Sequence, residues 1–212
     1  MKIFAVCLLL SMSSFAVADV LVVNIFKSMP GKNQLTLQYG QEAKAILSKL
    51  GANITLGVDM DGRLHLARSF NNWAAWAKFG KALQANGEWT AFLKKINKSP
   101  SAVLEDNYMM NTPVPGEVGA VYQVFIFEPV MGRAGDLLRS AMQAKAMHEK
   151  AGASVSISID QLQKLHYVTS YDSWDDWAKV QDTPNPEFQA FMKKQGEDPK
   201  AKLVKVYTAT SM

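Results

Sequence analysis

The order of hydrophobic and polar positions predicts the same set of elements twice along the chain. β-Branched and aromatic residues at 20–26 and 121–127 predict a strand at the start of each half. Apolar residues at helical spacing follow, and Gly51 or Gly152 stands where each helix should end. Further strands are expected at 53–59, 63–70 and 104–110, and in the second half at 154–160 and 203–209. With a second helical stretch before the last strand, the order is that of a ferredoxin-like βαββαβ unit.

Alternation within the first strand of each half suggests what its two faces contact. Successive side chains of a strand point to opposite faces, so the residues separate into two sets. The first face is apolar in both halves, with Leu21, Val23 and Ile25 in the first. The second face admits a carboxamide and carries Asn24 and Phe26, or Gln123, Phe125 and Phe127. We therefore expect the first face to pack on helices and the second to border a partly polar space.

The two halves are copies of each other. Residues 71–78 return as 172–179, with four of the five tryptophans in identical places. The same offset of 101 residues pairs Gly31 with Gly132 and His65 with His166, and it falls to 99 after the tryptophans. The second copy has therefore lost two residues in one loop.

Two ferredoxin-like repeats predict an α+β fold that closes on itself. A four-stranded sheet with helices on one side leaves its other face open, and here that face is expected to carry Phe26, Phe125 and Phe127. Two copies in one chain can bury these faces against each other. We expect a first repeat at 19–112, a linker at 113–120 and a second repeat at 121–212, forming one intramolecular barrel in a pseudo-symmetric monomer.

The first 18 residues have the pattern of a secretory signal. They contain one lysine, an apolar run at 3–10 and the sequence Ala16-Val17-Ala18. The apolar run is too short for a permanent membrane span, and no later stretch approaches about 18 apolar residues. The expected product is an exported protein of the bacterial periplasm. The single cysteine, Cys7, lies within this segment, so the mature chain would hold no disulfide or thiolate metal site.

The charge of the chain is mild and evenly distributed. The formal charge is +4, and removal of the signal with its one lysine lowers it to +3. No basic run occurs, so a nucleic-acid partner is not expected. The sequence also lacks glycine-rich nucleotide loops and paired-carboxylate motifs.

The most interesting polar residues are His65 and His166, which hold the same strand position in both copies. They could transfer protons or bind a haem or metal ion, or they could be buried histidines with a hydrogen-bond partner. We favour the structural interpretation. Neither histidine has a second metal-ligating residue at a suitable spacing, so no metal and no cofactor is expected.

The repeated tryptophans lie in a helix that Asn72 or Ser173 can cap. Trp73 and Trp174 are each followed by a second tryptophan three residues later, which places both rings on one helix face. They could line an aromatic pocket, but helical spacing favours the seam between helix and sheet.

The element order, and a strand ending in Ser69-Phe70 or Ser170-Tyr171 before the capped Trp-x-x-Trp helix, resemble the dimeric α+β barrel superfamily. This superfamily includes antibiotic-biosynthesis-monooxygenase-like and NIPSNAP-like domains. The resemblance implies that a ligand or active site lies within the barrel or between each sheet and its helices. It also implies two possible activities for the chain, that of a cofactor-independent oxygenase and that of a haem-degrading protein. The haem-degrading pattern has a histidine on the second helix, where this chain has Gln84 or Asn86.

Our leading hypothesis is an exported protein that binds a small apolar or aromatic molecule. A cofactor-independent monooxygenase-like or haem-related enzyme is the alternative, and a purely structural or protein-binding module is the third interpretation. No catalytic residue is assigned. The expected ligand contacts come from both copies and are Asn24, Phe26, His65, Trp73, Gln123, Phe125, His166 and Trp174.

Overall fold

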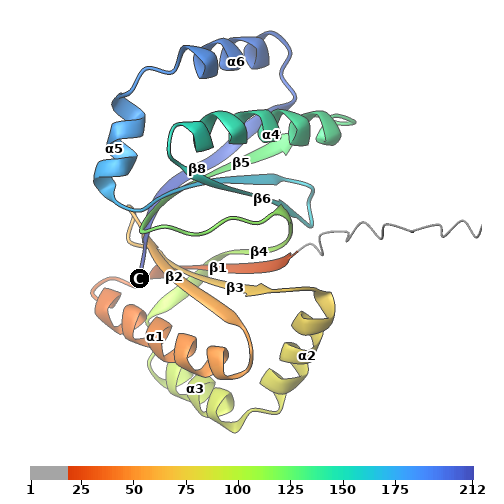
Figure 1. The fold of residues 1–212 in the computed structure, drawn as a ribbon. Coiled ribbons are helices and arrows are strands. Elements are labelled where there is room, and N and C mark those ends of the chain that lie inside the picture. Colours follow the sequence, from red (N-terminus) through yellow and green to blue (C-terminus); the bar gives the residue numbers. More distant parts are fainter. Residues whose placement is uncertain (1–18) are drawn as a thin grey trace, which may run out of the picture.

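The computed structural model describes residues 19–212 (Figure 1). The expected signal segment 1–18, with Cys7, lies outside the described residues. The elements of the first half are β1 (Asp19–Ser28), α1 (Asn33–Lys49), β2 (Asn53–Asp59), β3 (Leu64–Phe70), α2 (Trp73–Gln84), α3 (Gly87–Lys98) and β4 (Ala102–Val114). Those of the second half are β5 (Val121–Pro129), α4 (Ala134–Lys150), β6 (Ser154–Asp160), β7 (Leu165–Tyr171), α5 (Trp174–Asp182), α6 (Pro186–Glu197) and β8 (Ala201–Ser211).

The eight strands form one closed antiparallel barrel in the order β1-β3-β2-β8-β5-β7-β6-β4. Each half contributes a four-stranded sheet, and the two sheets join where β2 pairs with β8 and β4 pairs with β6. Helices α1 to α3 lie on one outer side and α4 to α6 on the opposite side (Figure 1). The predicted fold class, two ferredoxin-like repeats in an intramolecular α+β barrel, is confirmed.

The duplication extends to the register of the strands. In the first sheet Ile25 pairs with His65, and in the second Ile126 pairs with His166. An irregularity in the pairing with the last strand follows both isoleucines, between Ile25 and Phe26 and at the equivalent place of β5. The unpaired residue lies on the last strand in both copies, Glu105 of β4 and Val204 of β8, so each copy has a bulge at the same place.

Local sequence signals explain where the helices begin and end. The side-chain oxygen of Asn72 accepts a hydrogen bond from the backbone N–H of Ala75, and Ser173 does the same for Asp176. Gly51 and Gly152 follow α1 and α4 with φ angles of 91° and 103°, which disfavour side chains.

The faces of the first strands are the reverse of those expected. Val20, Val22 and Phe26 of β1 pack into the core beneath α1 to α3, and Phe125 and Phe127 of β5 pack beneath α4 and α6. The opposite face, with Ile25 and Ile126, points into the barrel. Both faces are buried, one by helices and one by the other sheet, so hydrophobicity alone does not distinguish them.

The interior of the barrel is a packed core. Tyr122, Val124, Ile126 and Ala209 form a buried cluster, with Tyr108, Val168 and Tyr207 against it. A Cβ atom at Gly57 would lie only 2.1 Å from the hydroxyl oxygen of Tyr122, so this aromatic side chain fills the space above a glycine. These side chains pack against one another in the barrel interior.

Candidate functional site

Each histidine of the repeated pair is bonded to an aspartate in the barrel interior. His65 Nε2 lies 3.0 Å from Asp59 Oδ2, and His166 Nε2 lies 3.1 Å from Asp160 Oδ2. Both imidazoles are 3% exposed. Because an ionised carboxylate only accepts hydrogen bonds, Nε2 of each ring carries the proton.

The two aspartates also build the hairpin turns before the histidines. The backbone N–H groups of Asp61 and Arg63 donate to Oδ1 of Asp59 at 3.0 and 2.9 Å. Asp160 accepts the equivalent bonds from Leu162 and Lys164. One carboxylate thus fixes a turn and orients the histidine six residues after it.

Burial sets the charge state of these pairs. It lowers the pKa of His65 and of His166, and the neighbouring aspartates do not reverse the shift. Burial also acts to raise the pKa of Asp59, but hydrogen bonds from His65 and Arg63 outweigh it and the pKa is lowered. Both rings therefore stay neutral, and the carboxylate of Asp59 stays ionised. Tyr207 and Tyr108 cover them at centroid distances of 4.8 and 4.7 Å, which fits a structural role.

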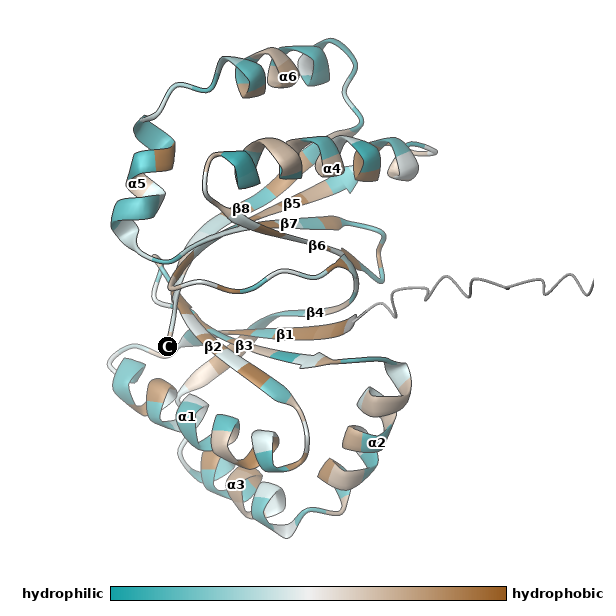
Figure 2. Ribbon diagram, in the orientation of Figure 1, coloured by the Kyte–Doolittle hydropathy of each residue, from teal (hydrophilic) through white to brown (hydrophobic). Residues whose placement is uncertain are grey.

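On their helical sides the two copies differ. Leu47, Leu66 and Phe79 belong to the tightly packed core of the first copy. The equivalent positions of the second copy are His148, Tyr167 and Val180. The helix α5 has 9 residues where α2 has 12, and neither α5 nor α6 contains a buried residue. Figure 2 shows α2 largely in apolar colours and α5 largely in hydrophilic ones.

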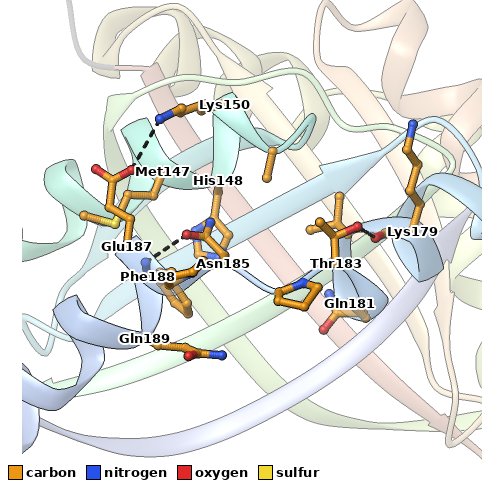
Figure 3. A pocket seen from close by; sticks show the side chains of 14 residues that line it. Met147, His148, Lys150, Lys179, Gln181, Thr183, Asn185, Glu187, Phe188 and Gln189 are labelled. Atoms are coloured by element: carbon orange, nitrogen blue, oxygen red, sulfur yellow. Dashed lines mark hydrogen bonds and ion pairs between the residues drawn. The ribbon is translucent and has the colours of Figure 1, made fainter.

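These differences accompany a cavity of about 660 Å³ in the second repeat. It lies between the C-terminal end of α4, the end of α5 and the start of α6 (Figure 3). It is partly open to solvent. Its lining combines apolar side chains with a few polar ones: Met147, His148, Lys150, Ala151, Lys179, Val180, Gln181, Thr183, Pro184, Asn185, Pro186, Glu187, Phe188 and Gln189.

The distinctive polar group of this cavity is His148, which belongs to α4. Its Nδ1 lies 2.8 Å from the hydroxyl oxygen of Tyr167 on β7, and its ring lies 4.7 Å from that of Phe188. Burial lowers the pKa of His148 and raises that of Tyr167, so both groups are neutral near pH 7. A neutral imidazole offers one N–H donor and one bare nitrogen acceptor, which suits polar contact or proton transfer.

Two polar contacts lie at the edge of the cavity, one between two helices and one within α6. Lys150 of α4 and Glu187 of α6 form an ion pair at 3.4 Å, which repeats the pair between Lys49 and Glu88 of the first copy. The side chain of Asn185 accepts a hydrogen bond from the backbone N–H of Phe188 at 2.9 Å and caps α6 (Figure 3). The cap therefore fixes the start of α6, and the exposed ion pair lies at the rim of the cavity.

The residues predicted from the sequence as ligand contacts do not form one site. Asn24 and Phe26 lie on the helical side of the first sheet, while His65 and His166 lie in the barrel interior. Gln123 donates a hydrogen bond to the hydroxyl of Thr208 at 3.0 Å. Their role in ligand binding stays a prediction.

The remaining three predicted contacts lie on the helical sides. Phe125 packs near the cavity of the second repeat, at 6.5 Å between its ring centroid and that of Tyr167. Trp73 and Trp174 are 42% and 41% exposed, and Nε1 of Trp73 donates to Asn111 at 2.9 Å. Both are thus half-exposed at the seam between helix and sheet.

His148 and Tyr167 were not predicted as functional residues. The position of His148 could have indicated a functional residue. An imidazole stands there at a helix position where the first copy buries an apolar side chain completely. Within residues 19–212, no cluster of three histidine, cysteine or acidic side chains suits a metal ion. In the same part of the chain, no helix has the length and apolar character of a membrane span.

Solved structures with the same architecture exist at low sequence identity. No family model and no curated protein matches the chain. A protein named as a monooxygenase from Lactobacillus acidophilus NCFM superposes with a TM-score of 0.65 at 12% identity, over 92% of this chain and 94% of that one. The chain has the dimeric α+β barrel fold, as a fused tandem repeat.

Two other structures with the barrel fold carry different names. One named as a chlorite dismutase has a TM-score of 0.59 at 10% identity, with coverage of 92% and 95%. A haem-binding protein from Thermus thermophilus has a TM-score of 0.56 at 6% identity, with coverage of 92% and 91%. At such identities the likeness establishes the barrel fold and no activity.

Proposed function

We propose that the protein is an exported, monomeric binding protein whose second repeat holds a small, largely apolar or aromatic molecule between α4, α5 and α6. The observation that carries this proposal is the replacement of Leu47, Leu66 and Phe79 by His148, Tyr167 and Val180. The first copy fills this space with its own side chains, and the second leaves a cavity with one half-buried polar pair.

The size and lining of the cavity support a small organic ligand. Sites for such ligands commonly enclose about 300 to 1,000 Å³ and combine apolar walls with a few placed polar groups. The 660 Å³ cavity has walls from Met147, Phe188 and prolines, and its polar contacts come from His148 and the amides of the α5–α6 region. This composition favours a molecule with an apolar body and one or two polar groups.

Export is supported by the pattern of residues 1–18, with its short apolar run and Ala-x-Ala ending. Fractionation of cells that produce the full chain tests this part of the proposal. We expect a product cleaved after Ala18 in the periplasm. Uncleaved protein in the cytoplasm would contradict export without affecting the binding site.

The binding proposal is tested by solvent extraction and mass spectrometry of the purified protein, with Val180→Phe as the decisive variant. This change restores the residue of the first copy, and we expect it to fill the cavity and remove an extractable ligand. Lys49→Gln, on the exposed surface of the first repeat, is the matched control and should retain the ligand. Equal ligand content in all three proteins, or none in the wild type, would contradict the proposal.

A second candidate function is favoured by the bond between His148 and Tyr167. A half-buried, neutral histidine on a cavity wall has the properties of a general base, and related barrels are named as monooxygenases. Haem fits the site in part, because His148 lines the cavity and has a hydrogen bond to Tyr167, as a ligating imidazole usually has to its surroundings. Lys150 and Lys179 would supply cations for the propionates.

Oxygen uptake with phenolic substrates and absorption spectra after addition of haem test this alternative. His148→Leu restores the residue of the first copy and should remove either signal, while Lys49→Gln should leave it unchanged. If neither signal appears in the wild type, the enzyme interpretation is excluded and the binding interpretation is unaffected.

A further inference from the structure

Arg68 stands on the helical side of the first sheet among apolar neighbours. It belongs to β3, where alternation places it on the same face as Leu64, Leu66 and Phe70. These three side chains are buried in the core beneath α1 to α3. A guanidinium on such a face is removed from much of the water that would otherwise solvate it.

No carboxylate compensates this charge. The chain has four arginines, and three of them form ion pairs: Arg63 with Asp59, Asp61 and Glu105, Arg133 with Asp136 and Asp198, and Arg139 with Asp136. Arg68 has no acidic partner among residues 19–212, and its buried Nε atom has no hydrogen-bond partner there. Burial alone lowers the pKa of Arg68. A buried cation without an anion is costly, so an ionic partner would be strongly favoured.

The one partner that the structure gives to Arg68 is Asn24 on β1. The guanidinium Nη2 donates to Oδ1 of Asn24. Because the amide oxygen is used in this way, the amide nitrogen of Asn24 is left as a donor beside the guanidinium. The two side chains together present mainly donors, from the guanidinium and from the amide nitrogen, which is the composition of an anion site. Both are partly accessible, so a small anion can reach them.

This pair is specific to the first copy. The equivalent positions of the second copy hold Phe125 and Thr169, so the amide and the guanidinium are both absent from that repeat. The arrangement is therefore separate from the cavity at His148. A ligand bound here would occupy the first repeat whether or not the second repeat binds one.

We propose that Arg68 and Asn24 form a binding site for the carboxylate of a small organic acid on the helical side of the first sheet. The guanidinium binds the carboxylate through its terminal nitrogens, and the amide nitrogen of Asn24 donates a further hydrogen bond.

Benzoate and its neutral analogue benzamide are suitable probes at constant ionic strength. We expect benzoate to raise the thermal midpoint of the full chain in a saturable way and benzamide to have little effect. Arg68→Met keeps an unbranched apolar stem and removes the charge, so it should weaken benzoate binding by about tenfold or more, measured by calorimetry. Lys27→Gln removes a charge from an exposed position of β1 and should leave binding unchanged.

Asn24→Asp distinguishes an anion site from a structural arginine. The new carboxylate would pair with Arg68 and take the place of the ligand, so the midpoint should rise and the response to benzoate should disappear. If benzoate stabilises the wild type no more than benzamide does, the proposal is wrong. It is also wrong if Arg68→Met or Asn24→Asp binds benzoate as tightly as the wild type. Neither result bears on the cavity of the second repeat.

Discussion

Asp106 and Lys205 occupy equivalent positions of the two repeats and form an ion pair with each other inside the barrel. Their sequence separation is the offset of 99 residues that relates the last strands of the copies. In a symmetric dimer of two identical chains, residues that touch each other across the two-fold axis at equivalent positions are always of the same type. In this fused chain the two residues carry opposite charges and meet at the pseudo-two-fold axis. In a homodimer of either repeat, the same two positions would carry like charges.

Reversal of this ion pair should show coupling between the repeats. Asp106→Lys places two ammonium groups together in a half-buried position and should lower the free energy of unfolding by about 1 to 2 kcal/mol. The double variant Asp106→Lys with Lys205→Asp should recover most of that loss. Urea unfolding of the four proteins forms a double-mutant cycle, and a coupling energy near zero would show that the pair is not an energetic link between the repeats.

The buried histidines predict loss of stability in mild acid. Burial lowers the pKa of all three histidines in the folded state, whereas in the unfolded chain each has its ordinary pKa of about 6.5. The unfolded state therefore binds more protons once the pH falls below about 6.5, and the free energy of unfolding decreases from there. The slope is at most about 1.4 kcal/mol per pH unit for each histidine.

Urea unfolding at pH 7.5, 6.0 and 5.0 measures this dependence. His148→Leu should reduce the slope by about one third, because one of three protonation sites is removed. A free energy of unfolding that is constant from pH 7.5 to 5.0 would show that these histidines accept protons as readily in the folded state as in the unfolded one.

The two aspartate turns should differ in strength although they occupy equivalent positions. Asp59 accepts a hydrogen bond from its histidine and also one from Nε of Arg63 at 2.6 Å, whereas Asp160 has no arginine partner. Asp59→Asn leaves Arg63 without its most buried acceptor, so we expect a cost of about 3 kcal/mol, against about 2 kcal/mol for Asp160→Asn. Chemical denaturation measures both values, and Lys27→Gln at an exposed position of β1 is the control. Equal costs would mean that Arg63 adds nothing to the turn.

Much of the fold could be predicted because both copies carry the same signals. The order of elements, the helix caps at Asn72 and Ser173, and the closed barrel all agree with expectations drawn from periodicity and duplication. The faces of β1 and β5 were assigned the wrong way round. Phe26 and Ile25 are both apolar, and each lies in a core. When a strand is buried on two sides, its hydrophobic pattern does not reveal which face contacts the helices and which faces the barrel interior.

The candidate site could not be found in the same way, because it lies where the copies differ. Comparison of the repeats identifies residues that are the same in both copies, such as His65 and His166, which are bonded to aspartates in the barrel interior. The cavity arises instead from the change of Leu47 to His148 and of Phe79 to Val180, and from a shorter helix. Only coordinates show that these separate differences meet in one space.

The differences between the copies predict that exchanging residues between them has opposite effects on the free energy of unfolding in the two repeats. Phe79 is 4% exposed and packs against Phe70 with 5.0 Å between ring centroids, so Phe79→Val should open a hole and cost about 2 to 4 kcal/mol. Val180→Phe adds the same group beside a space of about 660 Å³ and should leave the free energy of unfolding unchanged or raise it by up to about 1 kcal/mol. Denaturation of the ligand-free proteins measures both changes. If Val180→Phe is as harmful as Phe79→Val, the second repeat is packed at this position and the cavity does not persist in solution.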